Sequence, residues 1–218
     1  MMKNYFNILI SSLAALTLLV SSCDNRLTDI DGNHYDTVKM GDQVWMSANL
    51  SVTRFRNGDS IPYAASNEEW IKSGKEGKPA YCIIQNNKTF GIKYGKLYNW
   101  FAVVDPRGLA PKGWHVPSDE EWSALTDYLG GSVAAAMSMR VVNSYGQNKD
   151  KSSFSGLPGG ARALNGNFYG FESFGYWWAG TESVDQTAWV RVLGYNVLDF
   201  NSLHYNKTCG LSVRCVRN

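Results

Sequence analysis

The chain has 218 residues, of which 44% are hydrophobic, 13% aromatic and 18% charged, and its 21 Lys and Arg against 19 Asp and Glu leave a formal charge of +2. This apolar content is enough for a full core in one large domain or two small ones, and the low charged fraction argues against a disordered or coiled-coil chain. A nearly neutral chain without a basic block is also poorly suited to bind nucleic acid or an anionic membrane surface.

The N-terminus resembles the leader of a bacterial lipoprotein. After Lys3, residues 6–20 form a mostly apolar stretch that is shorter than the roughly 20 residues needed to cross a bilayer as a helix. It ends in Leu19-Val20-Ser21-Ser22-Cys23, which is similar to a lipobox. We therefore expect a signal peptide over 1–22, acylation of Cys23 and a lipidated tether over 23–30. The alternative is an ordinary signal peptide with a coincidental Cys.

Such an anchor would attach the protein to the bacterial cell envelope, with the outer membrane favoured and the periplasmic or surface face left open. The membrane is then a partner through the lipid alone. No later apolar run in the sequence is long enough to cross a bilayer.

A hairpin and four helices are predicted next. Residues 35–40 alternate in polarity, Gly41-Asp42 favours a turn, and 43–46 resume as a second strand. Capping boxes at 66–69 and 118–121 each predict the start of a helix, the second of which would end before Gly130-Gly131. Residues 97–104 favour a buried helix, although periodicity alone also permits a strand, and 132–142 favour another short helix.

The second half of the chain is dominated by aromatic runs that glycines separate. The runs at 175–178, 187–193, 197–205 and 211–216 have the spacing of strands joined by Gly and Asn turns, which predicts an antiparallel sheet. Within the first run, Tyr176 and Trp178 should point to one side of the strand and Trp177 to the other. Helices followed by strands place the chain in the α+β class.

Several ordered motifs resemble the Fibrobacter succinogenes major paralogous domain from Thr28 to the C-terminus. They are Thr28-Asp29-Ile30-Asp31-Gly32-Asn33-His34-Tyr35, Gly41-Asp42-Gln43-Val44-Trp45-Met46, Tyr94-Gly95-Lys96-Leu97-Tyr98-Asn99-Trp100, Pro111-Lys112-Gly113-Trp114-His115-Val116-Pro117-Ser118, Phe154-Ser155-Gly156-Leu157-Pro158-Gly159-Gly160, Tyr176-Trp177-Trp178 and Ser212-Val213-Arg214-Cys215-Val216-Arg217. The resemblance implies a single domain over 31–218. Its layout is similar to C-type-lectin-like and formylglycine-generating-enzyme-like domains, with a twisted antiparallel sheet and two to four short helices. Those relatives include sugar binders, protein binders, adhesins and an oxidase, so the fold leaves the function open.

With Cys23 assigned to the lipid, Cys82, Cys209 and Cys215 form an odd set in an oxidising compartment. In an extended strand, Cys209 and Cys215 would lie roughly 20 Å apart, beyond the limit of about 7 Å for a bridge, unless the chain turns at Gly210. Pairing of Cys82 with either of the others is therefore preferred, which leaves one thiol. The family that the chain resembles often has a Cys where Ala110 stands, so Cys215 would have lost its usual partner.

Catalytic signatures are weak in this sequence. His115 could act as a base oriented by Asp119 or Glu120, but we expect a structural histidine whose ring bonds to backbone. Acidic residues in a first helical turn are already explained by capping and the helix dipole. His34 and His204 have no spacing that indicates a metal, and we expect no cofactor. The motifs of lectin-type calcium sites are absent from the sequence, which leaves open a Ca²⁺ ion held elsewhere by carboxylates and carbonyls.

The aromatic residues divide into core and surface candidates. Trp45, Trp100, Trp114 and Trp122 lie within family motifs or on a helix face and are expected in the core. Aromatic rings near Gly and Asn loops are better placed to stack on a sugar or fill a partner's pocket. The candidates for ligand binding are Tyr169, Phe171, Trp178, Tyr195 and Tyr205.

The sequence favours a non-enzymatic, lipid-anchored envelope protein that binds a glycan or a surface protein. A structural or accessory subunit of a surface assembly, such as a fimbrial tip, is the alternative. A third hypothesis, a hydrolase of envelope polymers, requires a cleft in which His115 faces a carboxylate at hydrogen-bond distance.

Overall fold

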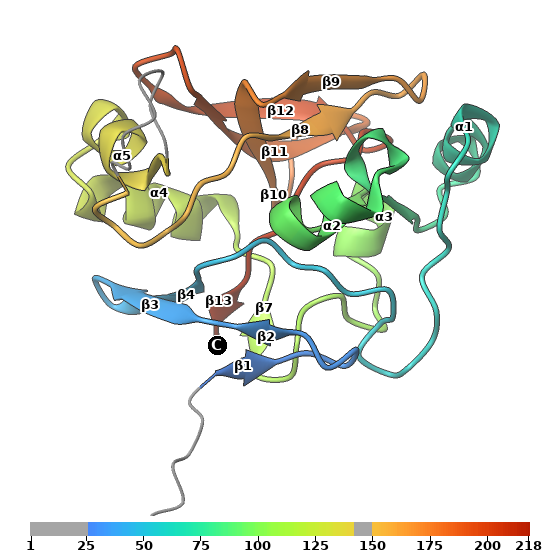
Figure 1. The fold of residues 1–218 in the computed structure, drawn as a ribbon, viewed down its shortest axis with the longest axis horizontal. Helices are drawn as coiled ribbons and strands as arrows, with labels where there is room; N and C mark the ends of the chain where they lie inside the picture. Colours follow the sequence, from blue (N-terminus) through green and yellow to red (C-terminus); the bar gives the residue numbers. More distant parts are fainter. Residues whose placement is uncertain (1–25, 142–149) are drawn as a thin grey trace, which may run out of the picture.

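A computed structural model describes residues 26–141 and 150–218, so the expected signal peptide, Cys23 and the start of the tether lie outside the described residues. The described chain is a mixed α+β fold with several antiparallel sheets (Figure 1). The elements in chain order are β1 (Leu27–Thr28), β2 (His34–Tyr35), β3 (Thr37–Met40), β4 (Gln43–Met46), α1 (Asn67–Lys75), β5 (Tyr81–Cys82), the 3-10 helix η1 (Ile84–Asn86), α2 (Lys88–Tyr94), β6 (Leu97–Tyr98), α3 (Trp100–Val103), β7 (Trp114–His115), α4 (Asp119–Tyr128), α5 (Ser132–Met139), β8 (Gly159–Arg162), β9 (Phe168–Phe171), β10 (Phe174–Glu182), β11 (Thr187–Gly194), β12 (Phe200–Asn206) and β13 (Val216–Arg217).

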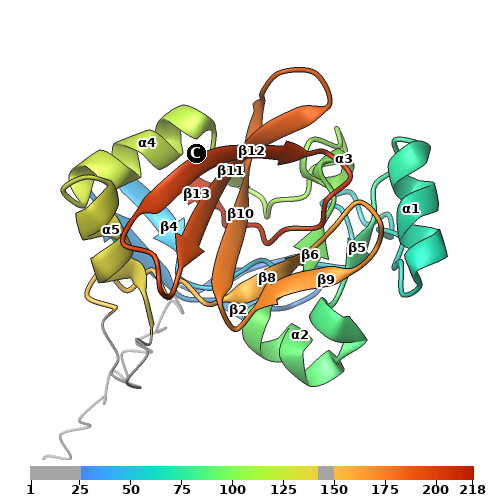
Figure 2. The same ribbon diagram turned by 90° about the horizontal axis from the view of Figure 1, so that it is seen from above.

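Two sheets frame the molecule. The longer strands form an antiparallel sheet in the order β10-β11-β12, and the predicted hairpin of β3 and β4 belongs to a second sheet in the order β3-β4-β13-β7. Seen from above, α4 and α5 lie together on one side of β10-β11-β12 and α1 lies on the opposite side (Figure 2). Because β13 pairs with both β4 and β7, the last residues of the chain meet its first hairpin.

Both predicted capping boxes are present. The hydroxyls of Ser66 and Ser118 accept from the backbone N–H groups of Glu69 and Glu121, and each Glu side chain accepts from its cap residue in return. The described residues contain five α-helices where two to four were predicted. The additional one is α2, which begins at the Asn87 cap and has Gly91 at its centre, a residue that lowers helix propensity.

Residues 97–104 do not form one helix as predicted. Leu97–Tyr98 is the strand β6, and the short helix α3 begins after it because the Asn99 side chain accepts from the N–H of Ala102. The segment 211–216, which was predicted as a strand, forms isolated bridges to Tyr98 and Trp177 before β13 starts at Val216. Its backbone groups bond in turn to Tyr98 of β6, to Tyr176 and Trp178 of β10, and to Leu50 and Met46, so it forms no single ladder.

The sheet β10-β11-β12 separates two parts of the core. Tyr176 and Trp178 lie on one face, beside their cross-strand partners Val192 and Val190 of β11. Trp177 points to the other face and packs into the other part of the core, as the alternation predicted. The four tryptophans expected in the core are all buried: Trp45, Trp100, Trp114 and Trp122. Within the part of the chain that the structure covers, no helix is long and apolar enough to span a membrane.

Candidate functional site

Three strands bring four aromatic side chains together on one face of the sheet β10-β11-β12. Tyr169 comes from β9, Phe174 and Tyr176 from β10, and Tyr205 from β12. The ring centroid of Tyr176 lies 5.6 Å from Tyr169, 5.9 Å from Phe174 and 5.8 Å from Tyr205. We call these four residues the tyrosine cluster. It contains Tyr169 and Tyr205, two of the residues that the sequence marked for ligand binding.

The local backbone explains why the rings can meet. Tyr205 pairs with Ala188 on the central strand β11, and this small side chain leaves room for the rings of the outer strands to approach one another. On the other side, Gly170 has a φ of +67°, and a Cβ there would lie 3.0 Å from the hydroxyl of Tyr176. Glycine at this position therefore lets β9 run close enough to place Tyr169 against Tyr176.

The cluster presents neutral hydroxyls. Tyr176 is 6% exposed, while Tyr169, Phe174 and Tyr205 are half-buried and pack against the core. Burial raises the pKa of all three tyrosines, in the case of Tyr176 to about 12, so each hydroxyl keeps its proton at physiological pH. None of these hydroxyls hydrogen-bonds to another described residue, and none is fully shielded from solvent. They can donate to and accept from a ligand.

The other three aromatic candidates lie elsewhere. Trp178 shares the face of β10 that carries Tyr176, but it is 0% exposed, and its indole N–H donates to the carbonyl of Tyr98 at 2.8 Å. Trp178 therefore has no exposed surface in this structure and is not part of the tyrosine cluster. The ring of Phe171 packs on Phe90 with centroids 4.7 Å apart, and the hydroxyl of Tyr195 donates to the carbonyl of Gly156.

The expected disulfide is not formed. Cys82, Cys209 and Cys215 are all buried and free. Cys82 belongs to a different part of the core from Cys209 and Cys215, so it is separated from both cysteines with which it was expected to pair. Burial raises the pKa of the Cys82 thiol to about 12 and that of Cys209 to about 11, so both thiols stay protonated and unreactive.

His115 is bound by side chains rather than by backbone, contrary to the prediction. Its Nε2 lies 2.9 Å from both carboxylate oxygens of Glu121, and its Nδ1 lies 2.8 Å from Oδ1 of Asn218. The contact with a carboxylate meets one condition of the hydrolase hypothesis, although the partner is Glu121 and not Asp119 or Glu120. Asp119 forms an ion pair with the buried Arg191 instead.

The described residues contain no group of three or more potential metal ligands from His, Cys, Asp and Glu.

The sequence did not single out Tyr176 and Phe174 as ligand contacts, because the position of Tyr176 in the cluster depends on two other strands. Their alternation with Trp177 and Gly175 was the available signal.

The model of one protein family, described as the Fibrobacter succinogenes major domain, matches residues 38–217. No curated protein and no solved structure proved similar enough to count as a match.

Proposed function

The chain belongs to the Fibrobacter succinogenes major domain family, and from this premise we propose that it is a non-enzymatic, lipid-anchored envelope protein that binds a glycan. The tyrosine cluster is the proposed contact surface. A domain similar in layout to C-type lectins would present this surface on a rigid sheet while the lipid holds the other end at the membrane.

The observation that carries the proposal is the meeting of Tyr169 and Tyr205 around Tyr176, with all three hydroxyls unbonded to the protein. A sugar ring has apolar C–H faces that stack on aromatic rings, and hydroxyls at its edge that need hydrogen-bond partners. Half-buried tyrosines supply both kinds of contact, and their rigid side chains lose little entropy on binding.

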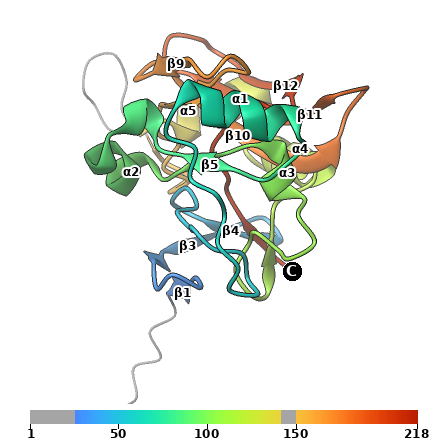
Figure 3. The ribbon, with the colours of Figure 1, turned by 90° about the vertical axis from the view of Figure 1, so that its right-hand side faces the viewer.

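The proposed lipid anchor is supported by the leader sequence. The segment Leu19-Val20-Ser21-Ser22-Cys23 is similar to a lipobox. The strand β1 begins at Leu27, a few residues after Cys23, and lies at the opposite end of the fold from β9 and β12 (Figures 1 and 3). An anchor at Cys23 would therefore leave β9 and β12, the strands that carry Tyr169 and Tyr205, at the end of the fold far from the membrane.

The geometry around His115 favours a structural role over a hydrolytic one. A general base needs a ring nitrogen that can take a proton from the substrate or from water. Both nitrogens of His115 are held by side chains of the protein, and the same Glu121 carboxylate also accepts from the backbone N–H of Ser118. The His115–Glu121 contact therefore connects β7 to the start of α4.

A glycan array probed with the full chain in a non-ionic detergent tests the proposal. We expect retention of a limited set of glycans by the wild type and loss of that signal in the double variant Tyr169→Ala/Tyr205→Ala. Tyr128→Ala is the matched control because this residue is 59% exposed on α4, away from the cluster. A protein that binds no glycan but co-purifies with a stoichiometric envelope partner would instead support a subunit of a surface assembly.

A further inference from the structure

A cavity lies between the N-terminal strands and α2. Its volume is about 420 Å³, which falls within the range of about 300–1,000 Å³ typical of small-molecule sites. Asn33, Ser51, Lys88, Lys93 and Lys96 are among the residues that line it. We call it the lysine cavity. None of the residues of the tyrosine cluster lines it.

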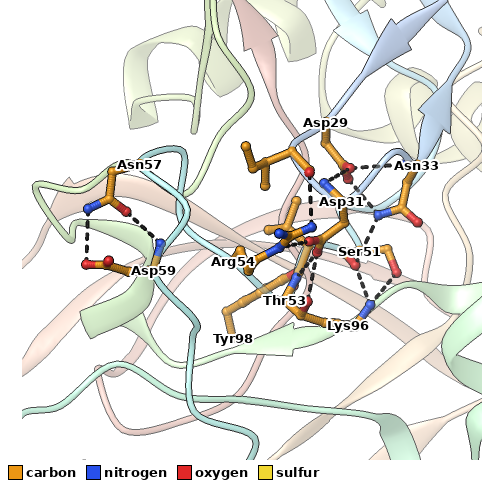
Figure 4. A network of polar contacts seen from close by, with 12 residues as sticks. Asp29, Asp31, Asn33, Ser51, Thr53, Arg54, Asn57, Asp59, Lys96 and Tyr98 are labelled. Atoms are coloured by element: carbon orange, nitrogen blue, oxygen red, sulfur yellow. Dashed lines mark hydrogen bonds and ion pairs between the residues drawn. The ribbon is translucent and has the colours of Figure 1, made fainter.

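The charged side chains that line the lysine cavity are lysines. None of the described residues that line it is acidic, and residues 77–104 of the sequence include lysines but no Asp or Glu. The nearest carboxylates, those of Asp29 and Asp31, are engaged within the N-terminal loop (Figure 4). Asp29 accepts from the Tyr35 hydroxyl and from Asn33, and Asp31 accepts from Thr53 and Arg54.

Lys96 has the most restricted position of the three lysines. Its side chain is partly buried, and its ammonium group donates to the carbonyl and the hydroxyl of Ser51 (Figure 4). An ammonium group has three N–H donors, so these two contacts leave one for a ligand. Burial lowers the pKa of Lys96, while the nearby Asp31 and Asp29 act in the opposite direction. A bound anion would compensate for the cost of desolvating this charge.

Two glycines allow α2 to form its side of the cavity. Gly95 has a φ of +75°, and a Cβ there would lie 2.8 Å from Cβ of Asn49 and 2.9 Å from the carbonyl oxygen of Leu50. At Gly91 a Cβ would lie 3.1 Å from the side chain of Ile83. The close approach of α2 to these segments places Lys93 and Lys96 beside Ser51 and Asn33.

We propose that the lysine cavity binds the carboxylate of an acidic sugar through Lys88, Lys93 and Lys96. The amide oxygen of Asn33 and the ring of His34 provide hydrogen-bonding groups for the sugar's hydroxyls, and Ile92 provides an apolar edge at the rim. This inference rests on the proposed function in one respect, since the glycan partner would supply the acidic sugar. The site itself is separate from the tyrosine cluster.

The test is calorimetric titration of the full chain in non-ionic detergent with trigalacturonate, galacturonate, neutral galactotriose and inorganic phosphate. The double variant Lys88→Ala/Lys93→Ala removes two exposed charges from the cavity. Lys72→Ala/Lys75→Ala removes the same number from the exposed surface of α1 and is the matched control. We expect trigalacturonate or galacturonate to bind the wild type, with a Kd about tenfold higher in the cavity variant and nearly unchanged in the control.

The inference would be overturned if galactotriose bound as tightly as trigalacturonate, or phosphate as tightly as galacturonate. It would also be overturned if the two double variants had equal effects, or if neither acidic sugar bound. Binding of the trimer without the monomer would assign the source of the carboxylate to a polysaccharide and support the inference. The variant Tyr169→Ala/Tyr205→Ala separates the two proposals. If a neutral glycan binds the wild type and the lysine variants but not Tyr169→Ala/Tyr205→Ala, the proposed function is supported. That result would hold even if the lysine cavity bound no acidic sugar.

Discussion

The side-chain oxygen of Asn49 accepts two hydrogen bonds from the guanidinium group of Arg214, although 165 residues separate them in the chain. The same oxygen accepts from the indole N–H of Trp177 at 2.8 Å. Arg214 is 0% exposed, and its guanidinium carbon lies 4.1 Å from the centroid of the Phe154 ring. Its guanidinium N–H groups also donate to the carbonyls of Met46, Phe154 and Ser155. One buried cation therefore joins the segments after β4, before β8 and before β13.

Arg214→Lys should lower the free energy of unfolding by roughly 2–4 kcal/mol, because an ammonium group lacks the planar fork and leaves buried acceptors without partners. Chemical denaturation followed by tryptophan fluorescence measures the loss. Arg217→Lys is the control, since Arg217 is exposed in the same C-terminal segment and should change stability by less than about 0.5 kcal/mol. Equal losses in the two variants would show that Arg214 does not join these segments.

The thiols of Cys82, Cys209 and Cys215 should resist alkylation in the folded protein and react once it is unfolded. All three are buried and free, and burial raises their pKa values. Mass spectrometry after iodoacetamide treatment at pH 8, with and without denaturant and without reductant, measures this. Two cysteines that stay unmodified in denaturant would reveal a disulfide.

Stability should decline in alkaline solution partly because of the same thiols. The unfolded chain ionises them near the usual pKa of 9.0, whereas the folded protein holds Cys82 at about 12 and Cys209 at about 11. Above pH 9 the unfolded chain therefore binds fewer protons than the folded protein. The stabilising contribution is complete below pH 9 and is lost as the pH rises towards the folded-state values, by up to about 1.4 kcal/mol per pH unit for each thiol.

The variant Cys82→Ala isolates this effect. Its unfolding free energy between pH 9 and 11 should fall less steeply than that of the wild type, whatever its stability at neutral pH. Urea midpoints measured at a series of pH values give both slopes. Parallel curves would mean that Cys82 ionises normally in the folded protein.

Glu121 should matter more than its neighbour Glu120. The Glu121 carboxylate accepts from the N–H of Ser118 and contacts His115, so Glu121→Ala should cost about 1–2 kcal/mol of stability. Glu120→Ala, in the same turn and exposed, should cost less than about 0.5 kcal/mol. Thermal unfolding of the two variants under one condition compares them, and a larger effect at Glu120 would refute this account of the His115 contact.

The sequence predicted best those features that depend on neighbouring residues. The capping boxes at Ser66 and Ser118 involve residues three positions apart, and the turn at Gly41-Asp42 determines its own hairpin. The alternation of Tyr176, Trp177 and Trp178 also follows from a single strand. These local rules were enough to predict the α+β class, whereas the burial of Trp45, Trp100, Trp114 and Trp122 was predicted from their places in family motifs or on a helix face.

Features that depend on distant partners could not be predicted. Trp178 and Tyr205 were both predicted to bind a ligand, but packing buries Trp178 fully and leaves Tyr205 partly exposed. The Asn49–Arg214 contact and the meeting of Tyr169 with Tyr205 arise only when separate segments pack together. The lysine cavity was missed because the charge of the whole chain is nearly zero, which conceals the acid-free segment 77–104.

The central claim is that the tyrosine cluster binds a glycan. Its most direct test is the dissociation constant of the best array glycan for the full chain and for the single variants Tyr205→Ala and Tyr128→Ala, all in the same detergent. Removing one stacking ring should raise the Kd about tenfold in Tyr205→Ala and leave it nearly unchanged in Tyr128→Ala. An unchanged Kd in Tyr205→Ala, with the fold intact, would contradict the claim.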